Sequence, residues 1–198
     1  MAEVLNVKVR ESRGKRETRR LRRSGAIPLI LYGHKEATVS LQVAADEIRL
    51  FKHAGGRTVV DPTPRTLARD PLALARIARA TGLNVVMGAG YYVAASHPPD
   101  MDRRSVDEII RELVADVTVG VGESGVRSGL LGEIGCTWPW AENEKKCVRA
   151  AVHAQRDTGA PLMIHPGRDA RAPFEILDVV RKEGGDLGRT IMCHICRT

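Results

Sequence analysis

From residue 51 onward, short apolar runs alternate with longer amphipathic stretches, and this alternation limits the fold more than any other feature of the chain. The apolar runs, which we predict to be buried strands, are residues 58–61, 84–88, 130–135, 161–165 and 190–194. The amphipathic stretches, which we predict to be helices, are residues 70–80, 105–117, 142–156 and 173–183. Strands that alternate with helices of this length form parallel β/α units, so the sequence predicts an α/β fold.

Residues at the ends of the predicted helices support this assignment. Ser105 stands three residues before Glu108, which is the spacing of a capping box at a helix start. Pro173 fits the first turn of its helix, where a missing N–H is tolerated. Gly82 and Gly159 follow two other predicted helices, as glycine often does because it adopts the left-handed conformation easily.

Three side chains that bind metals occupy the ends of successive predicted strands: Glu133, His165 and His194. Taken singly, each residue is more often structural, with Glu133 as the ion-pair partner of an arginine and each histidine as a loop cap. The C-terminal ends of parallel strands meet at one rim, however, so three such residues in register favour one shared site. Two imidazoles and a carboxylate are a competent zinc set with a fourth position open to water. Hydrolysis of an ester, amide or phosphoester is the reaction class that follows.

Other polar and aromatic residues near these strand ends carry two interpretations each. Arg168, three residues after His165, is placed to hold an anionic group of a small-molecule substrate, and a surface turn is an equal alternative. Tyr91 and Tyr92 follow the strand at 84–88, and either line a substrate pocket or belong to the core.

The remaining histidines and the cysteines give weaker signals. Cys193 and Cys196 form a single CxxC without a second pair at zinc-ribbon spacing, so buried or incidental thiols are favoured over a structural zinc or redox role. His97 and His153 are interpreted as surface or packed residues rather than ligands.

The first 50 residues differ in charge from the rest of the chain. They hold 11 of the 31 Lys and Arg residues but only 6 of the 24 Asp and Glu residues, within a net charge of +7. Strands are predicted at residues 5–9, 27–32 and 39–43. Between the first two, Arg16, Arg19, Arg20 and Arg23 fall on one face of a predicted helix. Such a row of guanidinium groups suits the phosphates of a nucleic acid, and a solvated charged helix is the alternative.

The string VRESRGKRETRRLRRSGAIP followed by LYGHKEATVSLQV resembles the start of the bacterial 5S-ribosomal-RNA-binding ribosomal proteins of the CTC family, which have a small β-barrel fold. The resemblance covers residues 3–50 and implies contact with 5S ribosomal RNA through residues 8–35. It assigns the RNA contacts to Arg16, Arg19, Arg20, Arg22, Arg23 and Tyr32. The family's barrel requires further strands, which this chain does not supply.

The strings MGAGYYV, GLLGEIGCTWP, HAQRDTGAPLMIHPGR, APFEIL and IMCHICRT resemble the phosphotriesterase family of the amidohydrolase superfamily, in particular its phosphotriesterase-related branch. The resemblance covers residues 51–198. It implies a partial β/α (TIM-type) barrel of about five parallel strands, with Glu133 as a bridging ligand and His165 and His194 as ligands of the more exposed of two zinc ions. The family's first-strand His-x-His pair and eighth-strand aspartate have no counterpart here. The resemblance therefore implies one zinc ion at best, weak hydrolysis and no assigned catalytic residue.

We therefore expect two domains, a small basic β-rich segment at residues 1–50 and a phosphotriesterase-like partial barrel at residues 51–198. Two alternatives to a zinc-dependent hydrolase remain: an RNA-binding module, and an inactive fused or truncated gene product. No apolar run is long enough for a membrane span and no secretory signal is recognised, so a cytoplasmic protein is expected. Exposed sheet edges predict self-association.

Overall fold

The computed structural model describes residues 8–9, 20, 26–31, 39–44 and 48–195. The chain divides into two compact units. One unit comprises residues 1–60 and 70–85, and the other comprises residues 61–69 and 86–198. The predicted metal ligands all belong to the second unit.

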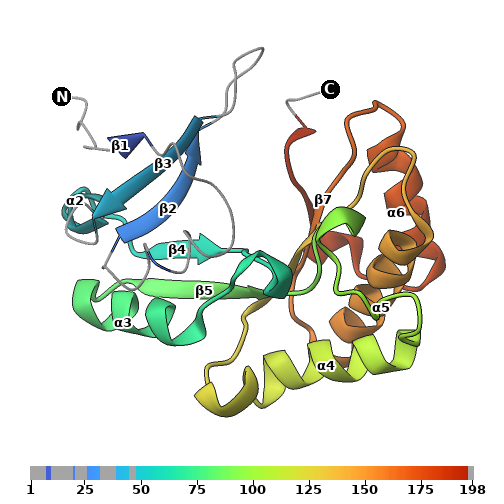
Figure 1. The fold of residues 1–198 in the computed structure, drawn as a ribbon, viewed down its shortest axis with the longest axis horizontal. Helices are drawn as coiled ribbons and strands as arrows, with labels where there is room; N and C mark the ends of the chain where they lie inside the picture. The colour runs from blue at the N-terminus through green and yellow to red at the C-terminus, as the bar shows by residue number, and fades with distance from the viewer. Residues whose placement is uncertain (1–7, 10–19, 21–25, 32–38, 45–47, 196–198) are drawn as a thin grey trace. The chain divides into compact units, whose positions relative to one another are not determined.

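A three-stranded antiparallel sheet in the first unit confirms the predicted strands of the basic segment where they are described, while residues 5–7 and Tyr32 lie outside the described residues. It has the order β1-β3-β2, with β1 at Lys8–Val9, β2 at Ala26–Leu31 and β3 at Val39–Ala44. The strands β2 and β3 pair along their whole length (Figure 1). Of the residues predicted to contact RNA, Arg20 is described and exposed. Arg16, Arg19, Arg22, Arg23 and Tyr32 lie outside the described residues.

Five parallel strands form the second sheet, in the order β4-β5-β6-β7-β8, as the α/β alternation predicts. Their bounds are Thr58–Asp61 for β4, Asn84–Ala89 for β5, Leu130–Gly135 for β6, Leu162–His165 for β7 and Thr190–Met192 for β8. Spatial order follows chain order, which is the arrangement of a barrel segment. The predicted strand at 190–194 is too long, because β8 ends at Met192 and a turn follows.

The helices lie close to their predicted positions. They are α2 at Ile48–His53, α3 at Pro71–Thr81, α4 at Val106–Thr118, α5 at Glu142–Thr158 and α6 at Ala172–Lys182. Short 3₁₀ helices occur at Arg65–Leu67 (η1), Ala94–Ser96 (η2), Gly122–Ser124 (η3) and Leu187–Arg189 (η4). The capping box of α4 is present, because Ser105 and Glu108 exchange hydrogen bonds. Gly82 and Gly159 end α3 and α5 with φ angles of 64° and 71°.

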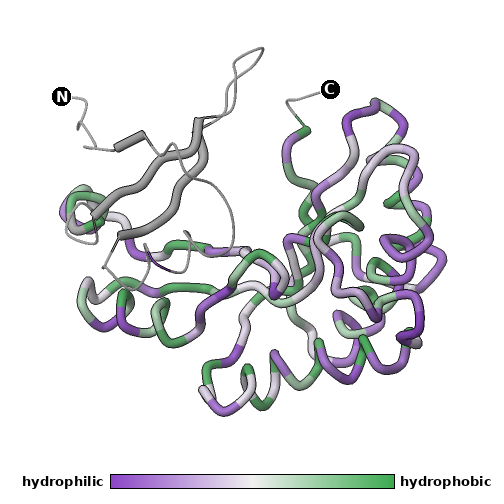
Figure 2. Tube along the Cα trace, viewed as in Figure 1, coloured by the Kyte–Doolittle hydropathy of each residue, from purple (hydrophilic) through white to green (hydrophobic). Residues whose placement is uncertain are grey.

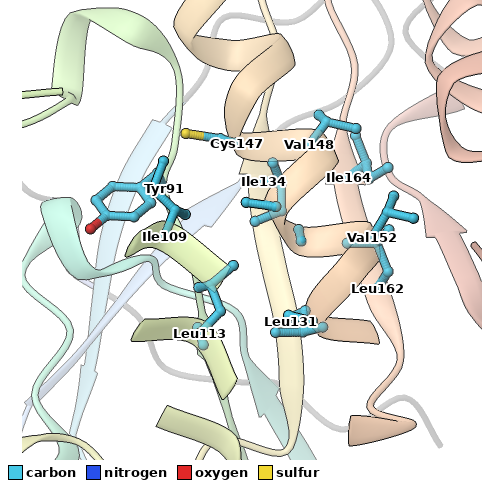
Figure 3. Close-up of a cluster of buried hydrophobic side chains, with 14 of the residues drawn as sticks. Tyr91, Ile109, Leu113, Leu131, Ile134, Cys147, Val148, Val152, Leu162 and Ile164 are labelled. Carbon is cyan, nitrogen blue, oxygen red and sulfur yellow. The ribbon is translucent and has the colours of Figure 1, made fainter. Parts of the chain in front are cut away.

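The hydrophobic core of the second unit forms where α5 packs on β6 and β7 and where α4 packs against α5 (Figure 3). Each buried aliphatic side chain here contributes about 1.5–3 kcal/mol. Apolar and polar positions alternate along these helices, so that one face of each can be buried (Figure 2). The core side chains from the strands are Leu131, Ile134, Leu162 and Ile164, and those from the helices include Ile109, Leu113, Val148 and Val152. This packing fixes the two strands that carry Glu133 and His165.

The last strand, β8, pairs with β7 on one side, and Ile191 on it is 46% exposed. This exposed position agrees with the predicted self-association, which stays a prediction. Within the described ranges, each helix is either too short or too polar to cross a bilayer.

Candidate metal centre

The parallel register brings the three predicted ligands to one end of the sheet. Glu133 lies in β6 and His165 is the last residue of β7. Gly135 pairs with His165, and Ile164 pairs with Met192 at the end of β8. His194 lies two residues beyond β8, in a turn where its φ angle is 57°. The turn, rather than the strand, directs this imidazole toward the other two ligands.

The carboxylate of Glu133 lies between the two imidazoles. Its Oε1 is 2.9 Å from Nδ1 of His165 and 2.9 Å from Nε2 of His194. The two imidazole rings meet edge to face, with centroids 4.7 Å apart. The side chains of Glu133, His165 and His194 are 18%, 13% and 13% exposed. The three ligands therefore converge in a partly sheltered position that solvent still reaches.

The spacing of these atoms fits a divalent metal ion. One donor atom from each residue lies within 4.8 Å of the others, and in the described part of the chain they form the single group of this kind. Tetrahedral zinc with bonds of about 2.0–2.1 Å requires donor atoms about 3.3 Å apart. The two 2.9 Å distances need to open by only about 0.4 Å. Hydrogen bonds between the ligands thus hold them near the geometry that an ion requires.

Two opposing effects set the charge of Glu133. Burial raises the pKa of its carboxyl group, and the hydrogen bond and charge of His165, followed by those of His194, lower it. The net pKa lies below the ordinary value, so the carboxylate is ionised at neutral pH. An ionised carboxylate is the form that binds a metal cation.

Gly132 explains how the strand presents Glu133, and the sequence analysis did not single it out. Its φ angle is 137°, and a side chain there would run into the backbone oxygen of Met163. The β6–β7 register shifts between Leu131 and Ile134, so this is an irregularity in the strand. The Glu133 N–H donates to the carbonyl of Pro62 at 2.7 Å rather than to β7. A glycine inside an apolar strand is the signal that predicts such a bulge.

The two adjacent tyrosines differ in their surroundings, and the core alternative left open by the sequence holds for Tyr91. Tyr91 is 1% exposed and belongs to the core (Figure 3). Its hydroxyl donates a hydrogen bond to Glu112 at 2.8 Å. Tyr92 is half-buried, and its hydroxyl lies 3.2 Å from Nε2 of His165. The same hydroxyl lies 3.4 Å from Nδ1 of His165, so Tyr92 contacts the ring of a predicted ligand, a role that the sequence analysis missed.

The other candidate residues lie outside this cluster. Arg168 is exposed in the loop after β7, where its role as a substrate contact stays a prediction. His97 donates from Nε2 to the carbonyl of Tyr92, and His153 pairs with Glu183, so both are packed or surface residues as interpreted. Cys193 lies half-buried in the turn after β8, and Cys196 lies outside the described residues.

Comparison with known proteins gives a consistent family assignment. The sequence profile of the Phosphotriesterase family matches residues 23–198. A phosphotriesterase-related protein of Nematostella vectensis is 43% identical over 77% of this chain and 43% of its own length. The N-acetyltaurine hydrolase of Homo sapiens is 37% identical over 84% of this chain and 49% of its own length.

A solved structure agrees with these sequence matches. The phosphotriesterase homology protein from Escherichia coli, complexed with phosphate in its active site, superposes with a TM-score of 0.73. It is 30% identical, and the match covers 76% of this chain and 52% of that protein. The chain thus spans about half the length of the relatives that it matches.

Proposed function

Because the chain belongs to the phosphotriesterase family, we propose that it is a metal-dependent hydrolase that holds one zinc ion. The observation that carries this proposal is the convergence of Glu133, His165 and His194 on one point at the end of the sheet. The substrate class is an ester, an amide or a phosphoester.

The residues of this chain orient the ion and the reacting groups. Zinc supplies Lewis acidity and makes a water molecule acidic near neutral pH. Glu133 contributes the negative charge that retains the cation, while His165 and His194 contribute neutral nitrogens. The hydroxyl of Tyr92 lies 3.2 Å from Nε2 and 3.4 Å from Nδ1 of His165, and because a hydroxyl both donates and accepts, it suits either tautomer of that imidazole.

We favour an amide substrate with an anionic group. One relative is an N-acetyltaurine hydrolase, and another carries phosphate in its active site. Arg168 follows His165 by three residues, is exposed, and provides a guanidinium that matches a sulfonate, carboxylate or phosphate. Arg168→Met should weaken the binding of inorganic phosphate to the zinc-loaded protein about tenfold, a change typical of one charged contact. Unchanged phosphate affinity would remove Arg168 from the substrate site.

Turnover by this chain is expected to be slow. Family members use a further aspartate as the proton acceptor, and no counterpart is found in residues 51–198. Within the described residues, no second cluster of metal-binding side chains adjoins Glu133. General-base catalysis typically raises a rate by about 10²–10⁴-fold. A site with one ion and no assigned general base lacks this contribution.

Hydrolysis assays with zinc-loaded protein test the proposal. The substrates are N-acetyltaurine, a p-nitrophenyl ester and a p-nitrophenyl phosphotriester. Slow turnover should require zinc, stop on chelation and disappear in Glu133→Gln. The control is Glu123→Gln, which changes an exposed glutamate in η3. Turnover that is the same in Glu133→Gln and in the control would refute the proposed site, and no turnover with any substrate would favour the inactive alternative.

A second proposal, binding of 5S ribosomal RNA by residues 8–35, rests on the excess of cationic residues in the first 50 positions. The family profile begins at residue 23, so it includes part of this segment. RNA affinity should fall steeply with salt and persist in the presence of a chelator. Affinity that is lost on chelation would contradict RNA binding by residues 8–35.

A further inference from the structure

Glu144 is a carboxylate that is completely buried, with 0% of the residue exposed. Its Oε1 accepts a hydrogen bond from the backbone N–H of Ala94 at 2.8 Å. Its Oε2 accepts from the N–H and the hydroxyl of Thr137, at 2.9 and 2.8 Å, and from the N–H of Ala141 at 2.9 Å. A buried carboxylate requires such donors in place of water. Four donors around one side chain indicate a specific structural role.

The donors belong to three different segments beside the metal centre. Ala141 immediately precedes α5, Thr137 lies in the loop after β6, and Ala94 begins η2 in the loop after β5. The loop after β6 continues the strand that carries Glu133, and the loop after β5 carries Tyr92. A single carboxylate therefore ties these two loops to the start of α5.

Further contacts transmit this restraint to Tyr92. The carbonyl of Tyr92 accepts a hydrogen bond from Nε2 of His97 at 2.6 Å. Two residues after Tyr92, the N–H of Ala94 donates to Glu144. The preceding carbonyl, that of Tyr91, accepts from the N–H of Gly135 at the end of β6. The backbone around Tyr92 is thus fixed on both sides, and its hydroxyl lies 3.2 Å from the ring of His165.

We propose that Glu144 is a positioning residue of the metal centre, which holds the loop after β5 so that the Tyr92 hydroxyl stays beside Nε2 of His165. The inference rests on the proposed function, in which Glu133, His165 and His194 hold a divalent ion. When Nδ1 of His165 faces the ion, Nε2 carries the proton, and the Tyr92 oxygen is the nearer to it of the two ring nitrogens, at 3.2 Å against 3.4 Å for Nδ1. Such partners fix the tautomer and ring orientation of a ligand, and their loss lowers metal affinity about 10- to 100-fold.

Glu144→Gln tests this role, because the substitution keeps the size of the side chain and removes one acceptor. The amide oxygen is best placed at the Oε2 position, where three donors converge. The amide NH₂ then faces the N–H of Ala94, and the bond to the loop after β5 is lost selectively. The matched control is Glu142→Gln, which removes a charge from the same helical turn where the side chain is 87% exposed.

Metal affinity and the cobalt spectrum are the readouts. Metal-free protein is titrated with zinc in competition with a chelating dye, and with cobalt, whose visible absorption reports coordination geometry. Glu144→Gln should bind zinc about tenfold more weakly and change the cobalt spectrum, whereas Glu142→Gln should match the wild type. Hydrogen exchange at Ala94 should accelerate in Glu144→Gln alone. Wild-type affinity and spectrum in Glu144→Gln would overturn the proposal.

A double-mutant cycle with Tyr92→Phe separates positioning from general destabilisation. If Glu144 acts through Tyr92, Tyr92→Phe also lowers zinc affinity about tenfold, and Glu144→Gln adds less than about twofold in that background. Independent effects that multiply to about a hundredfold would contradict the proposal. Tyr92→Phe with wild-type affinity would also overturn it, even if Glu144→Gln fails to fold. A wild-type chain that binds no ion would instead refute the proposed function, and this inference with it.

Discussion

Gly132 is the position where a single methyl group should be least tolerated beside the metal centre. Its φ angle of 137° is unfavourable for any residue with a side chain, which costs about 1–3 kcal/mol. A Cβ would also collide with the carbonyl oxygen of Met163 and lie 2.9 Å from that residue's own Cβ, and overpacking of this kind costs about 1–3 kcal/mol more. Gly132→Ala should therefore lower the free energy of unfolding by about 2–6 kcal/mol.

Gly125→Ala is the matched control for this substitution. Gly125 also has a positive φ angle, 63°, but an added Cβ would meet nothing within 4 Å. Its cost is limited to backbone strain of about 1–2 kcal/mol. Urea unfolding curves of both variants and the wild type measure the difference. If Gly132→Ala were as stable as Gly125→Ala, the close approach of β6 to β7 would be wrong, and with it the account of how Glu133 is presented.

Three further predictions follow from packing and charge. Ile164→Ala should lower the free energy of unfolding by about 2–5 kcal/mol, because Ile164 is buried. Ile191 is 46% exposed, so Ile191→Ala should lower it by less than about 1.5 kcal/mol. Equal losses of stability in thermal melts of the two variants would contradict the assigned core. Burial raises the pKa of Glu112, but hydrogen bonds from Tyr91, Arg65 and Arg104 and the charge of Arg65 lower it by more, so the net pKa lies below the ordinary value of 4.5. Glu112 therefore stabilises the fold above pH 4.5, and this contribution is lost as the pH falls through the folded pKa. The stability gap between the wild type and Glu112→Gln should accordingly shrink in acid, and a gap that grows would refute the assignment. Burial raises the pKa of Cys147 to about 12 and that of Cys136 well above its usual range, so neither thiol should react with a thiol reagent before unfolding.

Periodic and local signals in the sequence were sufficient to predict most of the strands of the second sheet and the helices between them. Strand positions follow from apolar runs, and helix ends follow from particular residues such as Ser105 and Gly159, because caps depend on local chemistry. The convergence of the three predicted metal ligands was predictable as well, since parallel strands share one C-terminal edge. Their register in the structure confirms this expectation.

Features that depend on long-range contacts were not predictable from the sequence. The strand expected at 190–194 ends at Met192, because His194 turns away from the strand with a positive φ angle. The separate roles of Tyr91 and Tyr92 depend on which side of the loop each faces, and adjacent residues in a loop have no fixed periodicity. The role of Glu144 was likewise hidden, because a glutamate in a first helical turn is usually an exposed cap.

The central claim is that three distant residues jointly hold one cation, and zinc stoichiometry tests it most directly. Metal-free protein should take up one zinc ion per chain, and Glu133→Gln should take up none while Glu123→Gln keeps the ion. Two tightly held ions per chain, or undiminished zinc in Glu133→Gln, would contradict the account.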